Sequence, residues 1–302
     1  MRIIERLQSG EPCFSFEFFP PHTEKGVDSL FRTVVELSPL SPGYVSCTYP
    51  GSSTPTPDPE ISRRRKLTID LTRRIREDSG IEAMAHLTCS AHSRQDLIEI
   101  LDQLAEEGAH NVLALRGDPP QGGGGFVQAE GGFAHGVELI RLIRERGYTF
   151  CVGAACYPEK HQESPDPGLD LRYLKDKVDA GADFLISQLF FDNGRWFDFM
   201  RRVRDAGITV PVIPGLMPII NREGIIRMTE LSGAYLPEGL RAELDSHGDD
   251  AEAVVQTGIA HTTAQALELL DNGVPGIHFY TLNKSRATRE IVSAIRQHQG
   301  RR

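Results

Sequence analysis

Short runs of β-branched, aromatic and small residues alternate with longer amphipathic stretches along the whole chain. Side chains that alternate with a period of two predict strands, and apolar residues spaced three or four apart predict helices. The eight predicted strands span Cys13–Phe19, Tyr44–Tyr49, Glu82–Thr88, Asn111–Gly117, Thr149–Tyr157, Phe184–Phe191, Val210–Met217 and Gly276–Leu282.

A helical pattern fills each interval between these strands, and three of the helices end in a glycine suited to a C-cap, in EEGAHN, DAGADF and DNGVPG. Eight strand–helix units of this length predict a single-domain (β/α)8 barrel, a TIM barrel of the α/β class, over residues 1–302. A doubly wound open sheet is the alternative, but the order of elements shows no switch point for it. The predicted helices are Glu24–Leu37, Pro59–Asp78, Ser93–Glu107, Ala134–Arg146, Leu169–Ala180, Arg195–Ala206, Arg222–Leu231 with Ala251–Asp271, and Arg286–Gln297.

Alternation within the first strand orients it. Phe14, Phe16 and Phe18 share one face, which would pack under the helices, so Ser15 and Glu17 would point into the barrel. Barrel active sites lie at the carboxyl ends of the strands, and polar inward positions gather at that mouth. The same test places Ser46, Thr48, Met84, His86, Ile186, Gln188, His278 and Tyr280 on inward faces.

The charge balance of the chain excludes some classes of partner. The 33 Lys and Arg against 42 Asp and Glu give a formal net charge of −9, which argues against a nucleic-acid surface. The sequence has no apolar run long enough to span a membrane and no signal-peptide pattern, so we expect no membrane partner and a cytoplasmic location. The five cysteines form no CxxC pair and predict reduced, mostly buried thiols.

Glu17 is the strongest candidate for chemistry that the residues alone provide. It lies between phenylalanines in SFEFFPP, and burial keeps a carboxylic acid protonated near neutral pH, as a general acid requires. A structural glutamate bound to an arginine or to backbone amides is an equally acceptable interpretation.

Other motifs give weaker signals. ALRGDPP leads into a glycine run but lacks the ending of a phosphate loop, and its Arg116 and Asp118 could form a simple ion pair. His86, His161 and Asp118 have no metal-ligand spacing, so we expect no metal. The run RRRK, Arg63–Lys66, is most simply a solvated helix face, with anion binding as the less favoured alternative.

Taken in order, SFEFFPPHTEKG, VSCTY, AHLTC, ALRGDPP, AACYPEKH, LKDKVDAGADFLISQLFFD, PGLMPI and HFYTLNKS resemble the methylenetetrahydrofolate reductases over essentially the whole chain. The resemblance implies reduction of 5,10-methylenetetrahydrofolate to 5-methyltetrahydrofolate, which feeds methionine synthesis. It implies that NAD(P)H supplies the hydride through non-covalent FAD held in a (β/α)8 barrel. It also implies that the regulatory domain of the eukaryotic enzymes is absent.

The resemblance also assigns site residues, position by position. Glu17 matches the catalytic acid that protonates N10 of the folate, and Asp118 matches a residue between flavin and pterin that also tunes the flavin. Gln188, Tyr280 and Lys284 match substrate-binding positions. The positions that match flavin contacts are Thr48, Tyr49, His86, Arg116, Gly117, Asp118, Ala134, Tyr157, His161, Asp170 and Lys177.

The chain departs from the family pattern at several positions. Tyr173 and Asp176 stand where some members have Asn and Arg near the flavin phosphates, which predicts weaker retention of FAD. Phe133 replaces a tyrosine, Arg222 stands where an aromatic residue covers the folate, and Lys284 stands where others have Arg. The sequence does not distinguish NADH from NADPH, and it leaves a homo-oligomer open. The alternative functions are a metal-assisted hydrolase or lyase on the same barrel, and a flavin- or folate-binding protein without turnover.

Overall fold

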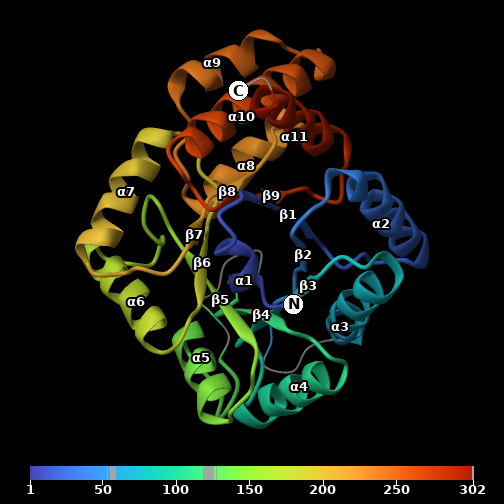
Figure 1. Cartoon of the computed structure of the whole chain (residues 1–302), viewed down its shortest axis with the longest axis vertical. Coiled ribbons are helices and arrows are strands. Elements are labelled where there is room, and N and C mark those ends of the chain that lie inside the picture. The colour runs from blue at the N-terminus through green and yellow to red at the C-terminus, as the bar shows by residue number, and fades with distance from the viewer. Residues whose placement is uncertain (53, 55–58, 118–125, 127, 301–302) are drawn as a thin grey trace.

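The computed structural model describes residues 1–300 except 53, 55–58, 118–125 and 127. Its strands form one parallel sheet with the order β7-β6-β5-β4-β3-β2-β1-β9-β8. Figure 1 looks down the resulting barrel, with the strands inside a ring of helices. The strands are β1 Cys13–Phe18, β2 Tyr44–Cys47, β3 Ala83–Thr88, β4 Asn111–Leu115, β5 Cys151–Cys156, β6 Phe184–Ser187, β7 Val212–Ile213, β8 Gly215–Leu216 and β9 Gly276–Tyr280.

The seventh predicted strand is divided into β7 and β8 at Pro214, because proline has no N–H to continue the ladder. Ile213 pairs with Ile186 of β6, whereas Gly215 pairs with His278 of β9. The carbonyl of Pro214 accepts a hydrogen bond from the His278 amide at 2.9 Å. The sheet therefore closes across Pro214, which confirms the predicted barrel.

The helices agree with the predicted pattern, with a few additions. The predicted helix-ending glycines Gly108, Gly181 and Gly273 all have positive φ. The sequence did not predict α1, the short 3₁₀ helix η1, or α9, which Figure 1 shows outside α10. The helices are α1 Ile3–Leu7, α2 Glu24–Leu37, η1 Ser38–Leu40, α3 Pro59–Ser79, α4 Arg94–Glu106, α5 Gly136–Glu145, α6 Pro167–Asp179, α7 Asn193–Asp205, α8 Arg222–Ser232, α9 Glu238–Ser246, α10 Ala251–Asp271 and α11 Arg286–Gln299.

Helix α1 closes the amino-terminal end of the barrel. Its Ile3 and Leu7 are buried in one cluster with Tyr44, Met84 and Phe184, which point inward from the strands. In Figure 1 the helix lies inside the ring of strands. This apolar plug leaves the opposite, carboxyl-terminal end of the strands as the open mouth.

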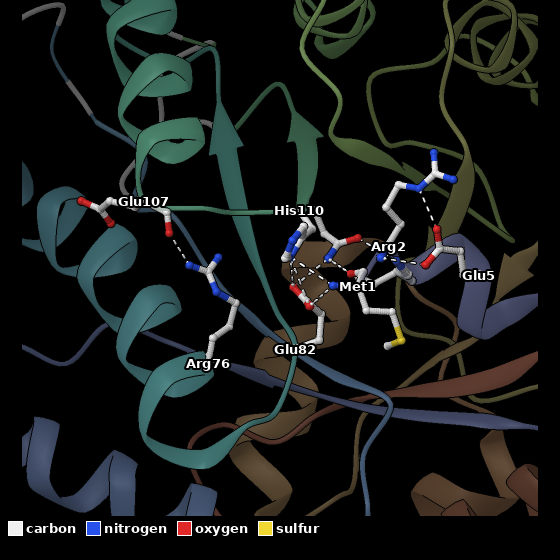
Figure 2. A network of polar contacts seen from close by, with 9 residues as sticks. Met1, Arg2, Glu5, Arg76, Glu82, Glu107 and His110 are labelled. Carbon is white, nitrogen blue, oxygen red and sulfur yellow. Dashed lines mark hydrogen bonds and ion pairs between the residues drawn. The ribbon is translucent and has the colours of Figure 1, made fainter.

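Polar contacts fix the segment that leads into α1, as Figure 2 shows. The Met1 ammonium group lies 2.7 Å from Glu82 Oε2 and 3.1 Å from His110 Nδ1. The Asn111 side chain accepts a hydrogen bond from the Ile3 amide and donates one to the Met1 carbonyl. These contacts attach the plug to the starts of β3 and β4.

The main hydrophobic core lies between the strands and the surrounding helices. Phe14, Phe16 and Phe18 belong to it, so the predicted outward face of β1 is confirmed. All five cysteines are buried free thiols, as predicted. No helix in the described part of the chain is long and apolar enough to cross a membrane.

Candidate active site

Glu17 projects into the barrel near the mouth, between two imidazole rings. Its carboxylate Oε2 lies 3.4 Å from Nε2 of His278 on β9 and 3.5 Å from Nε2 of His86 on β3. Glu17 is only 6% exposed and His278 is fully buried. The carboxyl group therefore faces two imidazoles and not an arginine, which was one of the two partners in the structural interpretation.

His278 is held in place on several sides. Its Nδ1 is 2.8 Å from Ser15 Oγ, in a hydrogen bond that joins two fully buried residues. The Tyr44 ring stacks on the imidazole at 6.2 Å between centroids, and the Tyr280 ring meets it edge-on at 5.3 Å. The imidazole is thus oriented with one nitrogen toward Ser15 and the other toward Glu17.

His86 is held in its neutral form. Burial lowers the pKa of His86 to about 4, although the nearby Glu17 charge acts in the opposite direction. At neutral pH the imidazole presents hydrogen-bonding groups but no charge to the Glu17 carboxyl.

The mouth also contains buried polar atoms that lack hydrogen-bond partners. These are Ser46 Oγ, His86 Nε2 and Thr88 Oγ1, on β2 and β3. Buried polar groups are normally paired, and unpaired ones are costly. Their positions on neighbouring strands fit a ligand that brings polar atoms to this side of the mouth.

Tyr280 and Gln188 lie on the other side of the mouth. The Tyr280 hydroxyl donates to the Ser187 carbonyl at 2.6 Å, and burial raises the pKa of Tyr280 well above its ordinary value, so it remains a neutral phenol. Gln188 is half-buried and its Oε1 accepts a hydrogen bond from the Leu189 amide at 2.9 Å.

A second group of predicted residues gathers after β5. Lys177 of α6 donates to the Ala155 carbonyl at 2.9 Å and lies 5.6 Å from the centre of the Tyr157 ring. The His161 ring meets Tyr157 edge-on at 4.7 Å. Burial lowers the pKa of both Lys177 and His161. The structure therefore brings Lys177 of α6 together with Tyr157 and His161 of the loop after β5.

Arg116 connects this group to the loop after β4. It forms a two-pronged ion pair with Glu163, and this pair lowers the pKa of the Glu163 carboxyl. Arg116 also lies 5.1 Å from the centre of the Phe126 ring. Asp118, its predicted partner, lies outside the described residues. Sequence reasoning missed Glu163 because the ion pair spans 47 residues.

The remaining predicted flavin contacts are spread around the mouth. Thr48 is half-buried at the end of β2, and Gly117 has φ +96° with Ser90 close enough that a Cβ would lie 3.0 Å from that side chain. The Ala134 amide donates to Glu138 at 2.9 Å, and Asp170 accepts from Ser164 at 2.7 Å.

The Tyr49 side chain points away from the mouth of the barrel. Its hydroxyl is 3.1 Å from His92 Nε2, and its side chain lines a hollow between α3 and α4, outside the barrel. A flavin contact from Tyr49 would therefore come from its backbone rather than from its ring.

The positions that depart from the family pattern are mostly at the surface. Lys284, Tyr173 and Asp176 are exposed, whereas Phe133 is half-buried beside the main core. Arg222 begins α8 and its Nη1 lies 3.5 Å from Asp245.

The described residues contain no group of three His, Cys, Asp or Glu side chains arranged to hold a metal ion. Of the residues in the alternative metal hypothesis, His86 faces Glu17 and His161 packs edge-on against Tyr157.

Comparisons with known proteins identify the family that this chain matches. The family model described as methylenetetrahydrofolate reductase matches residues 2–296. Methylenetetrahydrofolate reductase (NADH) 1 of Zea mays is 38% identical over 96% of this chain, and the chain spans about half of that protein, 49%. The 5,10-methylenetetrahydrofolate reductase of Pectobacterium carotovorum is 34% identical, with 93% of this chain and 89% of the relative covered.

A solved structure supports the fold independently. An uncharacterized Clostridium thermocellum protein, described as binding two copies of 5-methyl-5,6,7,8-tetrahydrofolic acid, superposes with a TM-score of 0.64. It has 14% sequence identity, and 99% of both chains is covered. The family model and the bacterial relative together show that this chain belongs to the methylenetetrahydrofolate reductase family.

Proposed function

We propose that this protein reduces 5,10-methylenetetrahydrofolate to 5-methyltetrahydrofolate with NAD(P)H. Family membership supports the reaction class. The observation that carries the proposal is the Glu17 carboxyl group, buried between two imidazoles at the carboxyl ends of the strands.

In the proposed reaction Glu17 supplies a proton to N10 of the folate. Protonation breaks the bond between N10 and the bridging carbon and leaves an electrophilic double bond between that carbon and N5. A hydride that originates from NAD(P)H then adds to the same carbon and completes the methyl group on N5, while the proton from Glu17 remains on N10. Glu17 is left as a carboxylate, and the nicotinamide leaves oxidised.

His278 and Ser15 can accommodate both protonation states of Glu17. When Glu17 is ionised, Nε2–H of His278 donates to it and Nδ1 accepts the Ser15 hydroxyl. When Glu17 is protonated, the other tautomer accepts its proton at Nε2, and Nδ1–H donates to Ser15. The pair therefore offers a hydrogen-bond partner before and after proton transfer, without burying a net charge on the imidazole.

We also infer that the mouth holds FAD, and the residues present fit that group. The unpaired Ser46, His86 and Thr88 atoms suit the polar edge of a flavin. Lys177 and Arg116 supply cations for its phosphates, although Glu163 offsets the charge of Arg116. When bound, FAD supplies two-electron chemistry that passes hydride from nicotinamide to folate.

Substrate binding falls to the opposite side of the mouth. Gln188 can hydrogen-bond the pterin, Tyr280 presents its neutral phenol ring to the same space, and Lys284 can meet the carboxylate of the folate tail. Asp118 is assigned to the pterin and flavin by resemblance alone.

The proposal is tested by supplying purified protein with methylenetetrahydrofolate, NADH or NADPH, and FAD, and measuring 5-methyltetrahydrofolate by mass spectrometry. We expect product in proportion to the nicotinamide oxidised, and a flavin spectrum on the protein. Binding of folate and flavin with no product would instead identify a binding protein without turnover. Product formation without bound flavin would retain the reaction and overturn the FAD assignment.

A further inference from the structure

Three consecutive arginines at the start of α3 donate to backbone carbonyls at the mouth of the barrel. Arg63 and Lys66 are exposed, as the predicted solvated face requires, whereas Arg65 is buried. Arg63 donates to the His22 carbonyl at 2.6 Å. Arg64 donates to the Pro20 carbonyl through Nε at 3.2 Å and Nη2 at 3.1 Å. Both of these carbonyls belong to the loop that follows β1 and Glu17.

Arg65 connects two further loops and is itself buried, with 5% of its surface exposed. Its Nε donates to the Pro50 carbonyl, after β2, at 3.1 Å. Its Nη2 donates to the Ser90 carbonyl, after β3, at 2.9 Å. The guanidinium also lies 5.4 Å from the centre of the Tyr49 ring. One planar group thus fixes two loops in a defined relative position.

Ser90 carries this connection to the next loop. Its amide donates to the Arg116 carbonyl at 3.1 Å, and its side chain is so close to Gly117 that a Cβ there would lie 3.0 Å away. Arg65 is therefore linked through one residue to the segment that carries Arg116.

Resting on the proposed function, we propose that Arg65 is a positioning residue of the reductase site. It holds the chain at Pro50, Ser90 and Arg116, after β2, β3 and β4. In this way Thr48 and Arg116 present their groups to the cofactor in one fixed arrangement. The guanidinium suits this role because its donors form a rigid fork that satisfies two carbonyls at once, whereas a lysine has a single nitrogen.

A hollow of about 490 Å³ lies beside Arg65, between α3 and α4. Arg65, Ile69, His92 and Ile100 contribute to its walls. It gives a small guanidinium compound a route to the space that truncation of Arg65 would leave. This makes chemical rescue a practical test.

The experiment compares Arg65→Ala, with and without ethylguanidinium, with Arg65→Lys and the control Arg73→Ala. Arg73 lies two turns further along α3, where it forms ion pairs with Asp70 and Glu77 of the same helix. The readouts are amide hydrogen exchange at 89–92 and steady-state kinetics of methylenetetrahydrofolate reduction.

We expect Arg65→Ala to speed exchange at Cys89 and Ser90 at least tenfold, while the β1 and β9 amides exchange as in the parent. The ratio kcat/KM should fall about 10- to 100-fold, chiefly through a higher KM, because displaced loops bind ligands poorly. Ethylguanidinium should restore part of the loss, Arg65→Lys should lie between parent and Ala, and Arg73→Ala should match the parent.

Exchange and kinetics of Arg65→Ala equal to those of Arg73→Ala would overturn the proposal. So would a kinetic loss that ethylguanidinium leaves unchanged. If Arg65→Ala does not fold, Arg65→Lys decides the matter, and parental exchange with parental KM in that variant would overturn it. If the parent makes no 5-methyltetrahydrofolate, the proposed function fails, whereas hydrogen exchange still tests the loop connection.

Discussion

The carboxylate Oε2 of Glu17 lies 3.4 Å from Nε2 of His278, on the neighbouring strand of the closed barrel. The β1–β9 register, in which Glu17 is opposite Tyr280 and Ser15 is opposite His278, places this imidazole below the carboxyl group. The contact exists because β1 and β9, the first and last strands of the sequence, are paired neighbours in the sheet.

This contact predicts the behaviour of His278 variants. His278→Leu removes both nitrogens, and the loss of a hydrogen bond to a charged group costs about 1.5–3 kcal/mol, or roughly 10- to 150-fold in rate. His278→Gln retains an N–H that can reach Glu17 and should lose much less. Rapid-mixing measurements of methylenetetrahydrofolate reduction check this, and a Leu variant as fast as the parent would contradict the assigned role.

His86 predicts a dependence of stability on pH. Its pKa in the folded protein is about 4 against 6.5 for the free side chain. Below pH 6.5 the unfolded chain therefore binds a proton that the folded protein does not, and stability falls until about pH 4. Because pH 5 is 1.5 pH units below the pKa of the free side chain, proton uptake by the unfolded chain lowers the free energy of unfolding by about 2 kcal/mol at this pH.

We therefore expect His86→Gln to lose about 2 kcal/mol less stability than the parent between pH 7 and pH 5. Urea unfolding at the two values measures this. His298→Gln is the control because His298 is exposed on α11. Equal pH dependence in all three proteins would show that His86 is not held neutral by burial.

Asp176 predicts a gain in cofactor binding. It is exposed on α6, the helix that carries Lys177, at the position where some relatives have Arg. We expect Asp176→Arg to tighten FAD binding by about 1 kcal/mol, or roughly fivefold, because it adds a cation near the phosphates. Equilibrium dialysis measures the Kd. Asp179→Arg, an exposed change on the same helix, is the control, and equal effects of the two changes would contradict a specific contact.

Asp118 yields a prediction that rests on the resemblance. A carboxylate near the pyrimidine edge of a flavin disfavours the anionic reduced form, so Asp118→Asn should raise the flavin potential. Folate binding should weaken by about 1–2 kcal/mol for one altered hydrogen bond. A redox titration of variant and parent is the test. An unchanged or lowered flavin potential would show that Asp118 does not lie beside the flavin.

Local patterns were sufficient to predict the barrel and the inward direction of Glu17, because alternation and helix-ending glycines are short-range signals. They did not predict the division of the seventh strand at Pro214, where closure of the sheet, rather than local propensity, decides the pairing. The plug helix α1 was missed because a helix of five residues has almost no period to detect.

In the candidate site too, local patterns predicted the inward positions of residues but not the contacts between them. The polar positions on β1, β3 and β9 could be assigned to one mouth from alternation, yet the contacts of Glu17 with His278 and His86 depend on register between strands distant in sequence. Arg65 resembled surface charge, because its neighbours in RRRK conceal that this one position faces two loop carbonyls.

The most direct test of the account follows Glu17→Gln through the two halves of the reaction separately. Transfer of hydride from NAD(P)H to the bound flavin needs no proton on folate, so its rate should match the parent. Reduction of methylenetetrahydrofolate by the reduced enzyme should slow about 10²–10⁴-fold, the usual cost of losing a general acid. Anaerobic stopped-flow absorbance records both rates, and equal slowing of the two halves, or no slowing of the second, would contradict the role of Glu17.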